Sequence, residues 1–130
     1  MAESNMKSGA FCWNELATRD VEGATKFYCD LLGWTASVDN SVGSPYTIFK
    51  KGETMVAGMM GMTEEYGDTP PHWMGYILVD DVDHAAKKTE ELGGKVCVPP
   101  MDIPSVGRFT VITDPTGATI SLIKFSTPSE

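Results

Sequence analysis

The stretch WNELATRDVEGATKFYCDLLG, residues 13–33, has a counterpart 61 residues later in MGYILVDDVDHAAKKTEELGG, residues 74–94. Each copy predicts a strand, an acidic helix cap, an amphipathic helix and a glycine stop. A unit of this length that occurs only twice indicates two similar modules that share one core. The constant offset aligns similar residues, pairing Asp20 with Asp81, Val21 with Val82, Glu22 with Asp83, Ala24 with Ala85, Lys26 with Lys87, Leu31 with Leu92 and Gly33 with Gly94.

Length and composition are those of an ordinary globular domain, with 130 residues of which 42% are hydrophobic. The 18 acidic against 10 basic side chains give a net charge of −8, which disfavours nucleic acid and anionic membranes and favours neutral or cationic small molecules. The three cysteines are widely spaced and form no CxxC pair, as is typical of reduced thiols. Residues 1–10 contain no apolar signal region, and no apolar run has bilayer length. We therefore expect a cytoplasmic protein with no nucleic-acid or membrane partner.

The first copy opens a β-α-β-β-β module that we place at residues 9–61. Alternating residues predict a strand over Gly9–Ala17. The Asp20 carboxylate can accept a hydrogen bond from the first free helical N–H groups, so a helix is expected to begin there and to end at Gly33. One face of this helix is apolar, formed by Val21, Ala24, Phe27, Tyr28, Leu31 and Leu32. The remaining strands are predicted at Trp34–Asp39, Tyr46–Lys50 and Glu53–Gly61.

The second module is placed at residues 72–125, after a polar linker at 62–71, and flexible tails are expected at 1–8 and 126–130. A strand over His72–Val79 precedes a helix over Val82–Leu92, which Asp80 or Asp81 caps. The sequence Asp114–Gly117 predicts a tight turn. Strands are predicted at Lys95–Met101, Gly107–Thr113 and Ala118–Phe125, with a turn at Ile103–Ser105. The fold class is therefore α+β, with two tandem β-α-β-β-β modules in a single domain, residues 9–125.

Four short motifs carry a resemblance to a known family: FY late in the first helix, LLGW after it, GG after the second helix, and DPTGATISL near the end. Their order and spacing resemble those of the vicinal-oxygen-chelate superfamily, which comprises glyoxalases, bleomycin-resistance proteins and extradiol dioxygenases. The resemblance implies two concave, mixed sheets that close around a pocket. It also implies a homodimer, because family members of this length commonly pair.

Enzymes of that family hold a divalent metal with four side chains, typically His or Gln on the first strands of the modules and Glu on the last strands. Carried over by spacing, three of these positions fall on Trp13, Met74 and Ser121. The fourth lies within Thr54–Gly61, which contains no carboxylate or imidazole. Indole, thioether and hydroxyl groups do not hold a hard divalent cation, so no metal and no other cofactor is expected.

When the same alternate residues of each strand face the pocket as in the family, the sequence predicts an aromatic and methionine-lined pocket with one acid. Such a pocket suits a flat or apolar small molecule, and the acid allows a cationic one. Glu15 is the catalytic candidate, because an inward carboxylate is costly without a partner or a task. The candidate ligand-binding residues are Phe11, Trp13, Glu15, Met60, His72, Met74, Tyr76, Arg108 and Ser121.

Structural roles are open for the same residues. Trp13 and Tyr76 can fill the core, Glu15 can form an ion pair with Arg108, and His72 can be a half-exposed surface residue. Two functions follow. The favoured one is a metal-free small-molecule-binding protein, because the missing ligands remove the family's shared electrophile. The alternative is a glyoxalase-like lyase or isomerase, or a dioxygenase-type enzyme, with unconventional metal ligands or with metal-free acid–base catalysis through Glu15. A domain that serves mainly in assembly is a third possibility.

Overall fold

The structure is a computed structural model that describes residues 7–40, 45–103 and 106–126. It divides into two compact units: the first unit, residues 13–74, and the second unit, residues 7–12 together with 75–126. Each unit is described by itself. The expected tails at 1–8 and 126–130 lie mostly outside the described residues, as does most of the turn expected at Ile103–Ser105.

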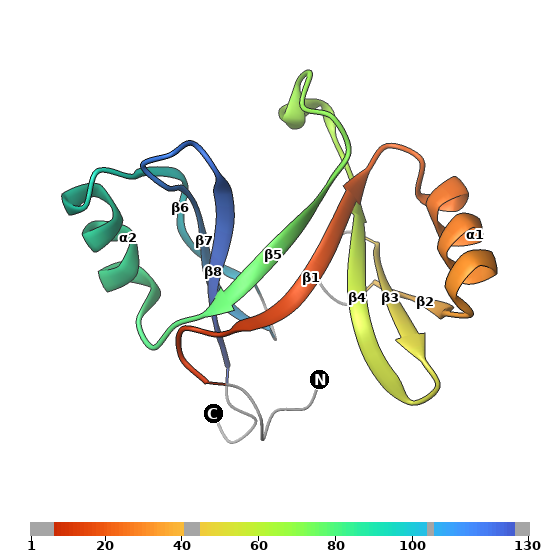
Figure 1. Cartoon of the computed structure of the whole chain (residues 1–130). Helices are drawn as coiled ribbons and strands as arrows, with labels where there is room; N and C mark the ends of the chain where they lie inside the picture. The colour runs from red at the N-terminus through yellow and green to blue at the C-terminus, as the bar shows by residue number, and fades with distance from the viewer. Residues whose placement is uncertain (1–6, 41–44, 104–105, 127–130) are drawn as a thin grey trace. The chain divides into compact units, whose positions relative to one another are not determined.

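The first unit forms a mixed sheet in the strand order β2-β3-β4-β1, in which β1 pairs in parallel with β4 and the other pairs are antiparallel. Its helix begins and ends as predicted: the Asp20 side chain accepts from the Gly23 amide at 2.8 Å, and Gly33 adopts a left-handed conformation with φ 73°. The elements are β1 (Phe11–Thr18), α1 (Val21–Leu32), β2 (Thr35–Asp39), β3 (Tyr46–Lys51) and β4 (Thr54–Gly61) (Figure 1).

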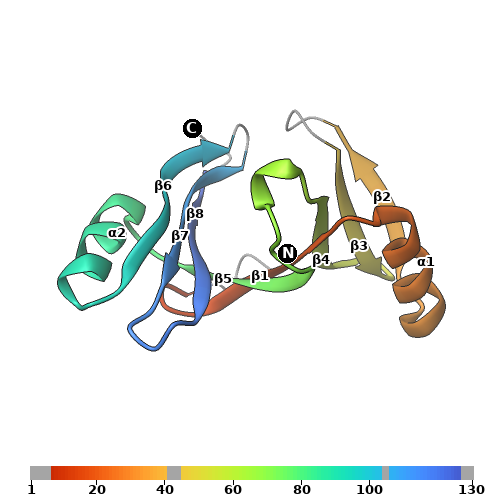
Figure 2. The ribbon, with the colours of Figure 1, turned by 90° about the horizontal axis from the view of Figure 1, so that it is seen from above.

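The second unit repeats this plan with the strand order β5-β8-β7-β6, again with one parallel pair, β5 with β8. Asp81 rather than Asp80 caps its helix, accepting from the His84 amide at 3.0 Å. The predicted turn is present, with the Gly117 amide bonded to the Asp114 carbonyl at 3.0 Å. The elements are β5 (His72–Leu78), α2 (Val82–Glu91), β6 (Lys95–Ile103), β7 (Gly107–Thr113) and β8 (Thr119–Phe125), and α2 lies against β6 and β7 (Figure 2). The boundary between the units falls within β1 and β5, so residues 11–12 count with the second unit and residues 72–74 with the first. The α+β class with two β-α-β-β-β modules is thus confirmed.

The residues expected to form a linker, 62–71, contain a short 3₁₀ helix, η2 (Glu64–Tyr66). The segment belongs to the first unit, and the Arg19 guanidinium donates a hydrogen bond to its Gly67 carbonyl at 2.7 Å. Among the described residues, neither α-helix is long and apolar enough to cross a membrane.

The core of the first unit lies between its sheet and α1, where Leu16, Phe49, Ala57 and Met59 are buried. The α1 residues that pack against this cluster are Val21, Ala24, Tyr28 and Cys29. The remaining apolar residues of the predicted helix face are exposed instead, at 56% for Phe27, 62% for Leu31 and 41% for Leu32. The apolar arc of α1 is therefore wider than the strip that the sheet covers.

Candidate functional site

Three polar side chains meet on the sheet of the first unit. The Trp13 indole Nε1 donates to the Tyr46 hydroxyl at 2.9 Å, and that hydroxyl donates to Glu15 Oε2 at 2.8 Å. Side chains alternate along β1, so Trp13 and Glu15 lie on the face opposite to Leu16, which packs toward α1. The acid is therefore half-buried on the sheet face away from the helix, and a tyrosine holds one of its oxygens.

Strand pairing explains why Tyr46 reaches the acid. Glu15 on β1 pairs with Gly58 on β4, and Ile48 on β3 pairs with the same glycine. Tyr46 lies two residues before Ile48, on the same face of β3. A Cβ at Gly58 would collide with the Tyr46 hydroxyl and ring carbon Cζ. The glycine therefore leaves the space in which the phenol crosses from β3 to Glu15.

Burial, followed by the charge of Glu15, raises the pKa of Tyr46 well above its usual value near 10. The hydroxyl consequently stays protonated and remains a donor to the carboxylate. Burial and the charges of Glu15 and Glu65 also raise the pKa of Tyr66, whose hydroxyl lies 3.6 Å from Met60 Sδ. Tyr66, in the segment expected to be a linker, thus lies close enough to Glu15 for its charge to affect the phenol.

Sequence reasoning missed both tyrosines. Two signals pointed to them: Gly58 interrupts an apolar strand, which indicates a close approach by another group, and Tyr66 is an aromatic residue in an otherwise polar segment.

The predicted binding residues divide between the two units. The structure brings Glu15 and Trp13 together through Tyr46, and it places Met60 beside Tyr66. Whether the full set lines one pocket remains a prediction. Trp13, Glu15, Met60, His72 and Met74 belong to the first unit, and Phe11, Tyr76, Arg108 and Ser121 belong to the second.

In the second unit, Tyr76 and Ser121 are paired residues of β5 and β8, and both are buried. The Ser121 hydroxyl, with a residue exposure of 1%, has no hydrogen-bond partner within the described part of the chain. Phe11 is 68% exposed and covers Gly75, where a Cβ would lie 2.8 Å from its ring.

Arg108 is engaged by two carboxylates within the second unit. Its guanidinium donates twice to Asp83, at 2.9 Å each, and once to Asp102 at 3.1 Å. These bonds lower the pKa of the Asp83 carboxyl. An ion pair between Glu15 and Arg108 would join the two units and stays a prediction, whereas within the first unit the Tyr46 hydroxyl donates to the acid.

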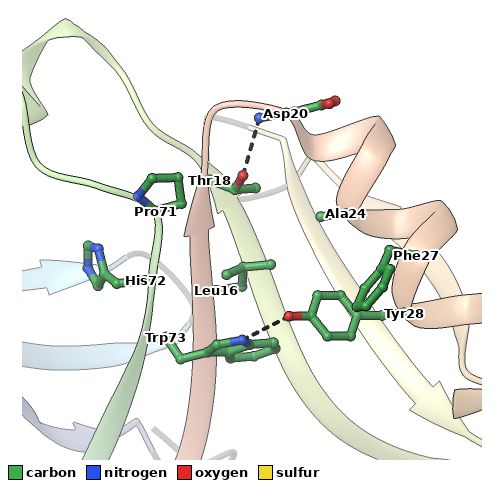
Figure 3. A pocket seen from close by; sticks show the side chains of 9 residues that line it. All are labelled: Leu16, Thr18, Asp20, Ala24, Phe27, Tyr28, Pro71, His72 and Trp73. Carbon is green, nitrogen blue, oxygen red and sulfur yellow. Dashed lines mark hydrogen bonds between the residues drawn. The ribbon is translucent and has the colours of Figure 1, made fainter. Parts of the chain in front are cut away.

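A groove of about 380 Å³ opens on the other face of the first sheet, beside α1 (Figure 3). Leu16 forms its floor, and the Trp73 indole donates to the Tyr28 hydroxyl at 3.1 Å across it. His72 lies at its edge, with Nδ1 2.9 Å from the Pro70 carbonyl. Over residues 7–40, 45–103 and 106–126, no three His, Cys, Asp or Glu side chains gather closely enough to hold a metal ion.

Comparison with known proteins identifies the family to which this fold belongs. The model of the Glyoxalase/Bleomycin resistance protein/Dioxygenase superfamily matches residues 11–122. This chain belongs to that superfamily, which confirms the resemblance seen in its motifs.

Two curated relatives illustrate the sequence similarity. The "Putative glyoxylase CFP32" of Mycobacterium bovis is 40% identical over 119 residues, which cover 91% of this chain and 45% of the relative. The "Anthracycline biosynthesis protein DnrV" of Streptomyces peucetius is 34% identical over 130 residues, which cover 88% and 46%. The chain thus spans about half the length of the curated relatives it matches.

Two solved structures share the fold. Methylmalonyl-CoA epimerase from Mycobacterium tuberculosis matches with a TM-score of 0.64 and 15% identity, covering 95% of this chain and 92% of the epimerase. A Mn(II)-bound glyoxalase from Novosphingobium aromaticivorans matches with a TM-score of 0.60 and 17% identity, covering 91% of this chain and 39% of the glyoxalase. At these identities the likeness extends to the fold alone.

Proposed function

We propose that this chain is a small-molecule-binding member of the superfamily, with Trp13 and Glu15 as the aromatic and acidic anchors of its ligand. The observation that carries the proposal is the Tyr46 hydroxyl, which bonds to both residues. These two bonds fix the rotamers of the indole and the carboxylate before any ligand arrives. A preorganised anchor binds more tightly because less side-chain freedom is lost on binding.

The charge of the site favours a particular ligand chemistry. Tyr46 remains protonated, so the phenol and the carboxylate together carry the negative charge of Glu15 alone. A flat or apolar ligand can stack on Trp13, and a cationic or hydrogen-bond-donating group on it can approach the carboxylate. The chain's net charge of −8 supports a neutral or cationic molecule over an anionic one. The predicted partners, Phe11, Met60, His72, Met74, Tyr76, Arg108 and Ser121, remain part of this proposal.

The donor chemistry supports a site without the family's metal. The Trp13 indole offers an N–H that is already donated to Tyr46, and its nitrogen has no lone pair with which to bind a metal. Met74 and Ser121, at the two further positions, offer a thioether and a neutral hydroxyl. This set does not fit a hard divalent cation. Elemental analysis of the purified protein should find no stoichiometric divalent metal, and about one Zn, Ni, Fe or Mn per chain would contradict the proposal.

A second candidate function is metal-free acid–base catalysis through Glu15. The bond from Tyr46 favours it, because it orients the carboxylate as a general base requires. The match to a relative named as a putative glyoxylase also supports a lyase or isomerase. The two functions differ in what the charge of Glu15 is for: a binding site uses it in the ground state, whereas a base uses it in the transition state.

One ligand screen separates these functions. Compounds found by thermal shift are measured by calorimetry on Trp13→Ala and Glu15→Gln, with Asn14→Ala, an exposed neighbour on β1, as the matched control. Trp13→Ala should cost about 2 kcal/mol of binding free energy, because it removes an aromatic anchor. Glu15→Gln should weaken cationic ligands and leave neutral aromatic ones unchanged. If it lowers turnover more than affinity, catalysis is the function; if it alters neither, Glu15 is a tolerated structural acid and the proposal fails.

The assembly and location of the protein belong to the same proposal. A homodimer is supported by the family's usual pairing, and light scattering that gives a mass near 14.1 kDa across the micromolar range would contradict it. A cytoplasmic location is supported by three free cysteines, Cys12, Cys29 and Cys97. The single domain at residues 9–125 remains a proposal as well.

A further inference from the structure

The groove beside α1 is lined by an aromatic cluster whose geometry is already fixed. The Trp73 indole is bonded to the Tyr28 hydroxyl at 3.1 Å, and the two rings lie edge to face with centroids 5.4 Å apart. Phe27 meets Tyr28 edge to face at 5.0 Å. Even so, Trp73 stays 42% exposed and Phe27 56% exposed. The rings therefore present apolar surface to solvent without the freedom to collapse onto one another.

The duplicated module forms its helix–sheet packing without aromatic residues at the corresponding helix positions. At the positions 61 residues after Phe27 and Tyr28, helix α2 has Lys88 and Thr89. Thr89 there simply donates its hydroxyl to the Ala85 carbonyl at 2.8 Å. The same helix–sheet packing thus forms with a cation and a small polar residue. Tyr28 packs against the core of the first unit, but the exposed rings of Phe27 and Trp73 need a separate reason.

The chemistry of the groove favours a cation. The faces of Trp and Tyr rings attract positive charge, and each such contact is worth about 0.5–1 kcal/mol at an exposed site. Asp20, at the end of the groove, adds a carboxylate. No lysine or arginine is among the described residues that line it. Figure 3 shows these side chains around the floor at Leu16, with the Asp20 carboxylate at the start of α1, which it caps, and the His72 ring across β5 from Leu16.

We propose that this groove, on the sheet face opposite to Trp13 and Glu15, is a second binding site, and that it takes flat aromatic cations. A planar cationic ring fits a cavity of about 380 Å³ and can stack on Trp73 and Phe27, while the Asp20 carboxylate at the end of the groove adds negative charge. The site is independent of the proposed function, because none of its lining residues contacts the Tyr46 hydroxyl bridge.

The test uses the indole N–H signals of the whole ¹⁵N-labelled protein, assigned with single Trp→Phe variants of Trp13, Trp34 and Trp73. The probe is 1-methylquinolinium, and the matched neutral probe is quinoline, which has nearly the same shape. Saturable movement of the Trp73 signal with the cation, and at least threefold weaker binding of quinoline, are the expected results.

Three variants locate the binding. Trp73→Ala and Phe27→Ala should each weaken the cation about two- to fivefold, because each removes a ring that the cation contacts. Asp20→Asn keeps the helix cap but removes the charge, so it should weaken the cation about threefold and leave quinoline unchanged. Leu31→Ala, on the same helix, 62% exposed and outside the groove, is the control and should change nothing.

Several results would overturn the proposal. A Trp73 signal that does not move at millimolar probe excludes the site. Movement of the Trp13 signal alone places the probe on the opposite sheet face, where it would instead support the proposed function. Equal affinity for quinoline excludes the preference for cations. A Trp73 signal that changes on dilution without any probe means that a second copy of the chain covers the groove.

Discussion

The third strand of the first unit begins with Tyr46, and the third strand of the second unit begins, 61 residues later, with Gly107. A Cβ at Gly107 would collide with the backbone of β8 at Lys124. This position of the second unit therefore cannot carry a side chain, whereas in the first unit it carries the phenol that bonds Glu15. The same scaffold position is thus a close backbone contact in one copy and part of the candidate site in the other.

The first strands differ in a complementary way. Glu15 on β1 pairs with Gly58, and its counterpart Tyr76 on β5 pairs with Ser121. Each unit therefore has a tyrosine near this strand pair. In the first unit it is Tyr46, which comes from β3, and in the second unit it is Tyr76, which lies on β5 itself. The first arrangement leaves room for an acid beside the ring. The two copies therefore share the frame, whereas the hydrogen-bonded tyrosine and acid lie in the first unit.

Gly58→Ala should produce the largest effect, because the new methyl group would occupy the place of the Tyr46 hydroxyl. The phenol is bonded on both sides and cannot turn away without breaking both bonds. Overpacking of this kind costs about 2–3 kcal/mol of unfolding free energy, measured by urea denaturation.

Two further variants show whether the phenol is the cause. Gly61→Ala on the same strand meets nothing closer than Val21 at 3.6 Å, so it should stay within about 0.5 kcal/mol of the parent. In a Tyr46→Leu background the cost of Gly58→Ala should largely disappear. If it persists there, the glycine has another purpose and the comparison with Gly107 loses its basis.

The fold could be predicted from the sequence because its signals are local. The cap at Asp20, the left-handed Gly33 and strand alternation depend on neighbouring residues. The second copy repeats the cap at Asp81 and has its left-handed glycine at Gly93, one residue before the counterpart of Gly33. Alternation also placed Trp13 and Glu15 on the sheet face opposite to Leu16. What alternation could not supply was the contact between Glu15 and a residue 31 positions away, because that contact depends on the register of two further strand pairs.

The groove was beyond prediction for a related reason. The helix pattern identified Phe27 and Tyr28 as apolar face residues but not how much of α1 the narrow sheet would leave uncovered. Trp73 comes 45 residues after Tyr28 in the chain, and only folding brings their side chains together. Local patterns predict which face a residue occupies, whereas the partner across that face is set by tertiary structure.

Tyr46→Phe should produce a smaller effect that depends on pH. The change removes a hydroxyl that accepts a hydrogen bond from Trp13 and donates one to Glu15. It should lower the free energy of unfolding by about 1–2 kcal/mol near neutral pH. The pKa of Tyr46 is raised on folding, so the unfolded chain loses this proton first, near pH 10, while the folded chain keeps it. The hydroxyl's contribution is therefore complete below about pH 10 and declines above it.

Chemical denaturation of both proteins, from neutral to alkaline pH, provides the measurement. The stability gap between wild type and Tyr46→Phe should be constant up to about pH 10 and should then narrow. Tyr66 also has a raised pKa, but it is present in both proteins and cancels in the difference. A gap that stays constant through the alkaline range would mean that the phenol is not buried beside Glu15.

The smallest effect is expected in the second unit, where the matching polar contacts lie at the surface. Arg108 bonds twice to Asp83 and once to Asp102, but the Arg108 and Asp83 side chains are 38% and 60% exposed. Solvent and salt screen such pairs, so Asp83→Asn should destabilise the protein less than Tyr46→Phe. Asp102→Asn, which removes a single bond, should have less effect still.

The pair of Asp83 and Arg108 should depend on pH and salt differently from the partly buried bonds of the Tyr46 hydroxyl in the first unit. Bonds from Arg108 lower the pKa of Asp83 below its usual value near 3.8, so the carboxylate's contribution to stability is present at neutral pH and is lost as the pH falls through that lowered pKa.

A double-mutant cycle of Asp83→Asn with Arg108→Gln isolates the pair from any effect of Asp83 on the first turn of α2. The coupling energy should shrink toward zero at about 1 M salt, where charges are screened within roughly 3 Å. Tyr46→Phe should show no such salt dependence near neutral pH, because the bonds it removes are shielded from solvent. A coupling between Asp83 and Arg108 that survives high salt would mean that the second unit, like the first, relies on a desolvated polar contact, and the contrast between the two copies would fail.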